Sequence, residues 1–352
     1  MAGNLILVVN PGSTSTKLAL YDGEEPRSTE TLRHDRETLN RFAGVWEQYD
    51  FRMDAVLRWV GARAAGYNAV AAIGGLLRPL SGGTYRVNFR MLDDARKNLQ
   101  GEHVSNLGCA MAAALAEKQK CNAYIVDPVS VDEFEPLARY SGHPLVERRT
   151  LSHALNIHAA ARRAAKHLNV QFEQSKFVIA HLGGGFSVAP VKGGKIIDVN
   201  DANSDGPFSP ERTGGLPLQQ FITLCYSGTY TEGQIRTLVR GRGGLSAYLG
   251  TNDAQEVERR IGGGDARARE VFDAMAYQIA KEIGAMAAVL EGSLHAIVLT
   301  GGLASSKALT DPISRRIRFI APVLLFPGED EMQALALGVL RVLRGDEAAL
   351  EY

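Results

Sequence analysis

Two segments about half the chain apart share one pattern of apolar and polar positions. In residues 5–22, an apolar run leads into a turn rich in Gly, Ser and Thr, and a second apolar run follows. In residues 177–199, an apolar run leads into three consecutive glycines at 183–185, and another apolar run follows. Each pattern predicts a strand, a tight turn and a second strand. The duplication indicates a protein built from two similar halves.

Both turns have the composition of a phosphate-binding loop. Glycine lets backbone N–H groups approach an anion closely, and Ser13, Ser15 and Lys17 add donors and a positive charge to the first turn. The first turn is not a Walker A loop, because it lacks the second glycine before the lysine and leads into a strand. Either turn alone is more often an ordinary hairpin. As a pair facing one another, they would hold a polyphosphate from both sides.

The remaining pattern alternates strands and helices, which predicts an α/β fold. Helical spacing of apolar positions predicts helices over 50–65, 103–119, 153–168, 266–290 and 331–344. Short apolar runs at 69–73, 123–126 and 296–299 predict buried strands. The repeated order of elements predicts two domains. One comprises residues 1–150 and 330–352, and the other comprises residues 151–329.

Composition narrows the class of protein. The 352 residues include 39 Lys and Arg and 39 Asp and Glu, so the formal net charge is zero. A neutral chain gives no electrostatic basis for binding nucleic acid or an anionic membrane. The cysteines at 109, 121 and 225 have no metal-site spacing and are expected to be reduced thiols. No signal peptide or membrane span is predicted, so we expect a cytoplasmic protein whose partners are small molecules or copies of itself.

Motifs along the whole chain resemble the butyrate kinase branch of the acetate and butyrate kinase family. They are NPGSTSTK at 10–17, GEHVSNLG at 101–108, VDPVSVDEF at 126–134, HALN at 153–156, HLGGGFSV at 181–188, GPFSPERTGGLP at 206–217, AYLGTNDA at 247–254 and LTGGLA at 299–304. The resemblance implies the actin-like fold of sugar kinases and chaperone ATPases, with ATP between two domains. It also implies reversible phosphoryl transfer from ATP to butyrate or a branched short-chain acid, and a homodimer or higher homo-oligomer.

The chemistry of such a transfer explains the residue types. A carboxylic acid ionises near pH 4, so its carboxylate attacks at pH 7 without a general base. Catalysis must instead offset the repulsion between a carboxylate and a polyphosphate and hold the two in line. Mg²⁺, arginine, histidine and backbone donors are therefore expected around the moving phosphoryl group.

The resemblance assigns residues to the nucleotide and the metal. The first turn would contact the terminal phosphates through Asn10, Ser13, Ser15 and Lys17, and Asn10 and Glu331 would be associated with Mg²⁺. The second phosphate turn would be Gly183, Gly184 and Gly185. Adenosine and ribose would lie against Thr251, Asn252, Asp253, Gly301, Gly302, Leu303 and Ala304. Glu331 has an alternative as an acidic residue at a helix start.

Other residues are assigned to transfer and to the acid substrate. The expected catalytic residues are Asp127, Arg212, His153 and His181, and the expected substrate residues are His103, Asn106, Gly74 and Gly75. Two alternatives stay open. Asp127 precedes Pro128 and could be a turn residue, and Arg212 could form a salt bridge with Glu211.

One position departs from the family pattern. The family usually has an arginine immediately before the Gly-Gly pair of the first domain, whereas this chain has Ile73. The loss removes a charge-assisted contact to the carboxylate or the phosphoryl group. Arg78, Arg86 or Arg90 could substitute for it.

The alternative function is therefore a catalytically weakened nucleotide-binding homologue. A chaperone-like ATPase is less favoured, because the chain offers no appended peptide-binding domain.

Overall fold

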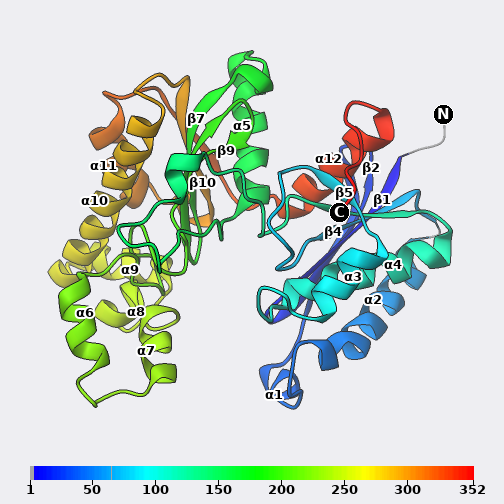
Figure 1. Ribbon diagram of the computed structural model, residues 1–352, viewed down its shortest axis with the longest axis horizontal. Helices are drawn as coiled ribbons and strands as arrows, with labels where there is room; N and C mark the ends of the chain where they lie inside the picture. Colours follow the sequence, from blue (N-terminus) through cyan, green and yellow to red (C-terminus); the bar gives the residue numbers. More distant parts are fainter. Residues whose placement is uncertain (1–3, 65) are drawn as a thin grey trace. The chain divides into compact units, whose positions relative to one another are not determined.

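The computed structural model describes residues 4–64 and 66–352, and the chain forms two compact units (Figure 1). Unit 1 contains the residues up to Asp132 together with Asp330–Tyr352, and unit 2 is Glu133–Glu329. Residues 133–150, assigned above to the first domain, group here with unit 2. Glu135 N donates to Ile197 O over 3.0 Å, and Ile196 N donates to a Glu133 carboxylate oxygen over 2.7 Å.

Unit 1 is built on one mixed sheet with strand order β3-β2-β1-β4-β6-β5. The parallel pairs are β1 with β4 and β4 with β6, and the other neighbours are antiparallel. The strands are β1 (Leu5–Gly12), β2 (Ser15–Asp22), β3 (Glu25–Arg33), β4 (Ala69–Ile73), β5 (Thr84–Arg86) and β6 (Asn122–Val126).

Helices cover both faces of this sheet. Apolar residues such as Leu7 and Val9 pack against α2 (Tyr49–Arg63) and α4 (Leu107–Gln119) on one face. Helix α12 (Glu331–Arg344) packs against β1, β4 and β6 from the other side (Figure 1). The shorter helical segments are α1 (Arg36–Leu39), η1 (Trp46–Gln48), α3 (Phe89–Arg96) and η2 (Val104–Asn106).

Unit 2 is built on a second mixed sheet with order β11-β10-β7-β8-β9. Its strands are β7 (Lys176–Leu182), β8 (Phe186–Lys192), β9 (Lys195–Ile196), β10 (Ala296–Gly301) and β11 (Val323–Pro327). Helix α10 (Ala266–Val289) packs on β7 and β8, and α5 (Ala154–Leu168) packs on β7 and β10. The remaining helical segments are η3 (Pro136–Arg139), η4 (Phe172–Gln174), α6 (Leu218–Cys225), α7 (Glu232–Val239), α8 (Gly244–Leu249), α9 (Ala254–Gly262), η5 (Gly302–Ser305) and α11 (Lys307–Ile317).

The two sheets repeat one topology. Each begins with a hairpin whose first strand also pairs in parallel with a later strand, so that β3-β2-β1-β4-β6 matches β9-β8-β7-β10-β11. Both hairpins predicted from the sequence are present, and each is the central structure of its unit. Among the described residues, no helix is long and apolar enough to cross a membrane.

Candidate active site

The turn between β1 and β2 presents free backbone donors. Gly12 pairs with Ser15 across the hairpin, which leaves Ser13 and Thr14 exposed at the tip. The N–H groups of Ser13 and Thr14 donate to no described residue. Ser15 is partly buried beside them. Backbone N–H groups that have no acceptor at an exposed turn can bind an anion.

Asn10, Lys17 and Glu331 come together beside this turn. Asn10 and Lys17 face each other in the β1–β2 register. Glu331 begins α12, and its Oε2 accepts a hydrogen bond from Asn10 Nδ2 over 2.9 Å and lies 3.5 Å from Lys17 Nζ. The Asn10 amide oxygen accepts no hydrogen bond from a described side chain. Mg²⁺ keeps most of its waters and uses one or two protein oxygens, so an amide and a carboxylate oxygen fit this ion.

Asp127 follows β6 in a constrained conformation. Its φ is 41°, in the left-handed region that few side chains adopt. Asp127 is buried, its Oδ1 accepts from Gly83 N over 2.7 Å, and its own N–H donates to Gly83 O over 3.0 Å. These bonds fix the turn at Gly83. Asp127 therefore does stabilise a turn, as one of the two interpretations of the sequence expected.

The second glycine turn connects β7 to β8 and lies against Arg212. None of Gly183, Gly184 and Gly185 has a positive φ, so backbone conformation does not require glycine there. At Gly185, close packing requires glycine instead, because a Cβ there would overlap the guanidinium of Arg212. The missing side chain lets the guanidinium rest directly on the turn.

The Arg212 guanidinium is mostly buried and only partly satisfied. Nη1 donates to Ala202 O over 2.9 Å, whereas the buried Nε has no hydrogen-bond partner among the described residues. Burial lowers the pKa of Arg212, and the neighbouring Glu211 charge opposes that shift. Among the described residues, no ion pair joins Arg212 to a carboxylate, so the salt bridge to Glu211 does not form. A buried donor left unpaired is unfavourable unless a ligand satisfies it.

His153 and His181 lie next to each other in the same part of unit 2. Their ring centroids are 4.5 Å apart, and His153 Nδ1 lies 2.9 Å from Ser187 Oγ. Burial lowers the pKa of His153 to about 4, with a further contribution from the Arg212 charge. Burial holds the pKa of His181 well below its usual value, and electrostatic repulsion from His153 lowers it further. Both rings are neutral at pH 7, and the buried His181 Nδ1 has no partner among the described residues.

A cavity of about 510 Å³ opens beside the second turn, entirely within unit 2. This volume lies in the range of small-molecule sites. Gly183 and Gly184 line it, together with Asn252, Asp253, Gly302 and Leu303. The predicted second phosphate turn and part of the predicted adenosine site therefore meet at one cavity.

Three predicted nucleotide residues support the cavity from outside its lining. Thr251 Oγ1 donates to Glu256 over 2.7 Å and accepts from Asp253 N over 3.2 Å. Gly301 has a φ of 92°, and a Cβ there would overlap Leu182 O. Ala304 is buried. Their positions indicate that they shape the backbone next to the cavity.

The predicted substrate residues of unit 1 mostly pack against one another. Asn106 is fully buried, its Oδ1 accepts from Leu76 N over 2.8 Å, and its Nδ2 donates to Asn98 and Gly101. A Cβ at Gly75 would overlap Asn106. Asn106 therefore holds the Gly-Gly loop in place, and this geometry does not support direct contact with a substrate. A Cβ at Gly74 would overlap Pro128.

His103 is exposed, in contrast to Asn106. Its Nδ1 accepts from Ser105 N over 3.3 Å and lies 2.7 Å from Ser105 Oγ, so the ring caps the turn before α4.

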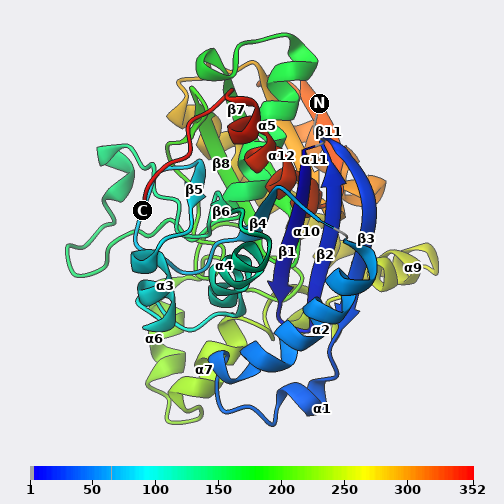
Figure 2. The ribbon, with the colours of Figure 1, turned by 90° about the vertical axis from the view of Figure 1, so that its right-hand side faces the viewer.

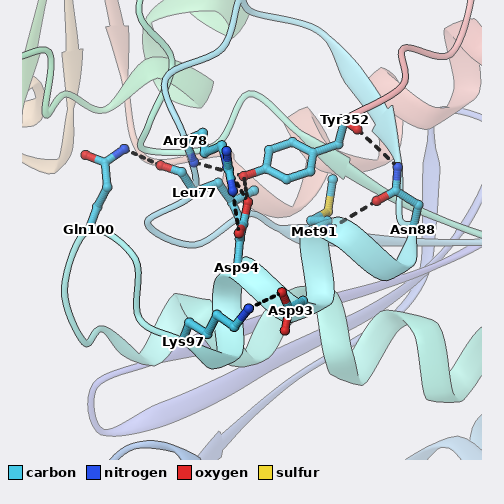
Figure 3. A network of polar contacts seen from close by, with 9 residues as sticks. All are labelled: Leu77, Arg78, Asn88, Met91, Asp93, Asp94, Lys97, Gln100 and Tyr352. Carbon is cyan, nitrogen blue, oxygen red and sulfur yellow. Dashed lines mark hydrogen bonds and ion pairs between the residues drawn. The ribbon is translucent and has the colours of Figure 1, made fainter.

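The arginines near Ile73 differ in availability. Arg78 forms a two-pronged ion pair with Asp94, in which Nε and Nη2 donate to the carboxylate oxygens over 2.6 and 3.0 Å (Figure 3). Tyr352 holds the same pair, because its hydroxyl donates to Asp94 and accepts from Arg78 N. Arg86 and Arg90 are exposed, and neither forms an ion pair within the described part of the chain. Of the three candidates, Arg78 is the least able to replace the missing family arginine.

Several cavity residues were not identified from the sequence. Glu211, Gln255, Glu258, Ser305, Ser306 and Glu329 all line it. Glu329 Oε1 lies 3.8 Å from His181 Nε2. Ser306 caps α11 by accepting from Leu309 N, and a serine before a helix was a signal available in the sequence. The other residues could not be identified from the sequence, because segments far apart in the chain bring them to the cavity.

Comparisons with known proteins identify the family. The acetokinase family matches residues 140–315. The chain is 51% identical to a probable butyrate kinase 2 of Caldanaerobacter subterraneus subsp. tengcongensis, over 99% of each chain. It is 50% identical to a probable butyrate kinase of Listeria monocytogenes, also over 99% of each. The crystal structure of Porphyromonas gingivalis acetate kinase matches 94% of this chain and 98% of its own with a TM-score of 0.75 at 17% identity, which shows the shared two-domain actin-like fold. The chain therefore belongs to the acetokinase family and is a kinase.

Proposed function

We propose that the protein transfers the γ-phosphoryl group of ATP to butyrate or a branched short-chain carboxylate. The products are the acyl phosphate and ADP, and the reaction is reversible. The observation that carries the proposal is the Arg212 guanidinium held against Gly185, with a buried Nε that lacks a partner. Two relatives that are 50–51% identical to this protein are named as probable butyrate kinases, which supports butyrate or a related acid as the substrate.

Each unit contributes residues suited to the nucleotide. The turn at Ser13 and Thr14 offers free N–H groups and Lys17 a positive charge, and the cavity of unit 2 has room for a nucleoside. Asn10 and Glu331 would hold Mg²⁺, which supplies positive charge to the phosphates when bound. We propose the two units as the functional domains.

The residues of this chain act by charge and orientation. The acceptor carboxylate is ionised at pH 7, so one of its oxygens attacks the γ-phosphorus while the bond from that phosphorus to the bridging oxygen of ADP breaks. Arg212 donates to the oxygens of the group in transfer, where negative charge is concentrated. The neutral His153 and His181 add donors without the cost of burying a second and third cation.

The deciding experiment is an assay of acyl phosphate formation. Butyrate, isobutyrate, propionate and acetate are each incubated with ATP and Mg²⁺, and the acyl phosphate is trapped with hydroxylamine. We expect the highest kcat/KM with butyrate or isobutyrate. Formation of no trapped product from any of the four acids would refute the proposal.

The alternative is a homologue that binds nucleotide and transfers poorly because of Ile73. It predicts that ATP raises the thermal stability without acyl phosphate formation, and that Ile73→Arg raises kcat sharply. Turnover of the unaltered protein at the roughly 1–100 s⁻¹ of ordinary kinases would exclude it. The chaperone-like ATPase has no supporting observation. The cytoplasmic location and the homo-oligomer stay predictions.

A further inference from the structure

Arg52 is a fully buried arginine directly behind the turn between β1 and β2. It lies on α2, and its exposed fraction is 0%. Among the described residues, no carboxylate lies within ion-pair distance of it, and burial lowers its pKa to about 10, so that it still carries its charge at neutral pH. A buried charge is costly and is nearly always paired with an opposite charge. An unpaired one therefore requires an explanation.

The guanidinium binds the carbonyl groups of the turn. Nη1 donates to Gly12 O and Ser15 O, each over 3.0 Å, and Nη2 donates to Ser13 O over 3.1 Å. Thr14 O accepts from His34 N over 2.8 Å. Every carbonyl oxygen from Gly12 to Ser15 therefore accepts a hydrogen bond, either from Arg52 or from His34 N. The N–H groups of Ser13 and Thr14, in contrast, are left free at the exposed tip.

The turn itself needs such support. Two-residue hairpins favour the primed turns, which require a positive φ at the first central residue. Neither Ser13 nor Thr14 has a positive φ, so this turn is not primed. Unprimed turns fit the twist of paired strands poorly. The fork of Arg52, whose Nε and Nη2 also bind Gln48 Oε1 at 3.1 and 3.0 Å, compensates for that mismatch.

We propose that Arg52 is a positioning residue for the phosphates of the nucleotide: it orients the donors of the first turn outward and keeps an uncompensated positive charge behind them. The inference rests on the proposed function for the identity of the ligand as a polyphosphate. An arginine with a merely structural role would be served better by a carboxylate partner. The neutral Gln48 in that position leaves the charge available to an anion in front of the turn.

Two variants separate geometry from charge. Arg52→Lys keeps the charge and loses the planar fork, so we expect it to weaken ATP binding about tenfold. Gln48→Glu keeps an oxygen at the same place and neutralises the charge of Arg52. We expect it to weaken ATP binding about three- to tenfold while thermal stability is unchanged or higher. The control is Ala62→Glu, which adds the same charge at an exposed position near the end of α2 and should bind ATP like the parent.

Binding is measured by isothermal titration calorimetry with ATP and, separately, with tripolyphosphate, at fixed ionic strength. Parental affinity in both Arg52→Lys and Gln48→Glu would overturn the inference. So would a Gln48→Glu protein less stable than the parent. If Arg52→Lys fails to fold, Gln48→Glu decides alone. Binding of both probes without acyl phosphate formation refutes only the proposed acid kinase, whereas binding of neither probe by the unaltered protein refutes both.

Discussion

Arg212 shows how a single side chain gains a function from its surroundings. The absence of a side chain at Gly185 lets the guanidinium lie on the second turn, and Ala202 O fixes one of its nitrogens. The charge is therefore pre-oriented and needs little rearrangement when a phosphoryl group arrives. An arginine that contacted ground and transition states equally would alter KM alone.

Removal of this charge should act mainly on kcat. We expect Arg212→Ala to lower kcat by about 10² to 10⁴, with little change in apparent ATP affinity, and added guanidinium to restore part of the rate. Steady-state kinetics measure both parameters. Arg242→Ala, which alters an exposed arginine of the same unit, is the control. A near-normal kcat combined with lost thermal stability would make Arg212 a structural residue.

The buried histidines predict how stability depends on pH. His153 has its pKa lowered to about 4 by burial, whereas the same side chain titrates near 6.5 when the chain unfolds. Between these values the unfolded state binds more protons, so stability falls as pH falls through that window. We expect His153→Gln to reduce the loss between pH 7 and 5 by up to about 2 kcal/mol, measured by urea unfolding.

The pH difference, and not the stability at either pH, is the quantity to compare. His143→Gln alters an exposed histidine and should lose as much stability as the parent between pH 7 and 5. If His153→Gln loses as much as well, the pH dependence originates elsewhere.

At the scale of elements, the turn of the second hairpin packs against the Arg212 guanidinium, which leaves no room for a side chain at Gly185. We expect Gly185→Ala to leave β7 and β8 paired but to displace Arg212, and so to lower kcat roughly tenfold or more. Gly184→Ala is the matched comparison, since its Cβ would meet nothing closer than Glu211 Oε1 at 3.7 Å. Steady-state kinetics should show a smaller loss in Gly184→Ala, and equal losses would argue against displacement of Arg212.

Local patterns predicted the elements well and their contacts poorly. The two hairpins and α12 follow from short runs of apolar positions, because strand and helix periods are local properties of the sequence. Asn106 shows the opposite case. Its motif suggested a substrate contact, whereas in the structure its amide binds Leu76 N, Asn98 and Gly101 O. Arg52 lies in the helix predicted at 50–65, but no pattern could show that it binds the carbonyls of a turn 40 residues away.

At the scale of the whole molecule, the two units differ in continuity. Unit 2 is one uninterrupted stretch, whereas unit 1 needs residues 330–352 to complete it. Helix α12 packs against β1, β4 and β6 (Figure 2), and Gly338 lies so close to β6 that a Cβ there would overlap Val126. Without α12, no other described helix covers this apolar face of the first sheet.

We therefore expect the two units to behave differently as fragments. Residues 133–329 alone should unfold cooperatively on heating, followed by circular dichroism. Residues 1–132 alone should show no cooperative transition, because the uncovered face removes a large part of the buried apolar area. Addition of a peptide spanning 330–352 should restore the transition. Cooperative unfolding of residues 1–132 without the peptide would contradict this account.

The discontinuity of unit 1 also sets an order of events on the ribosome. The strands of the first sheet are synthesised early, but α12 appears only after the whole of unit 2 has been made. At 5–20 residues per second, the nascent sheet waits on the order of ten to forty seconds for its covering helix. During that interval its apolar face is open to chaperones and to neighbouring nascent chains. We therefore expect the part of the chain that is made first to complete its folding last.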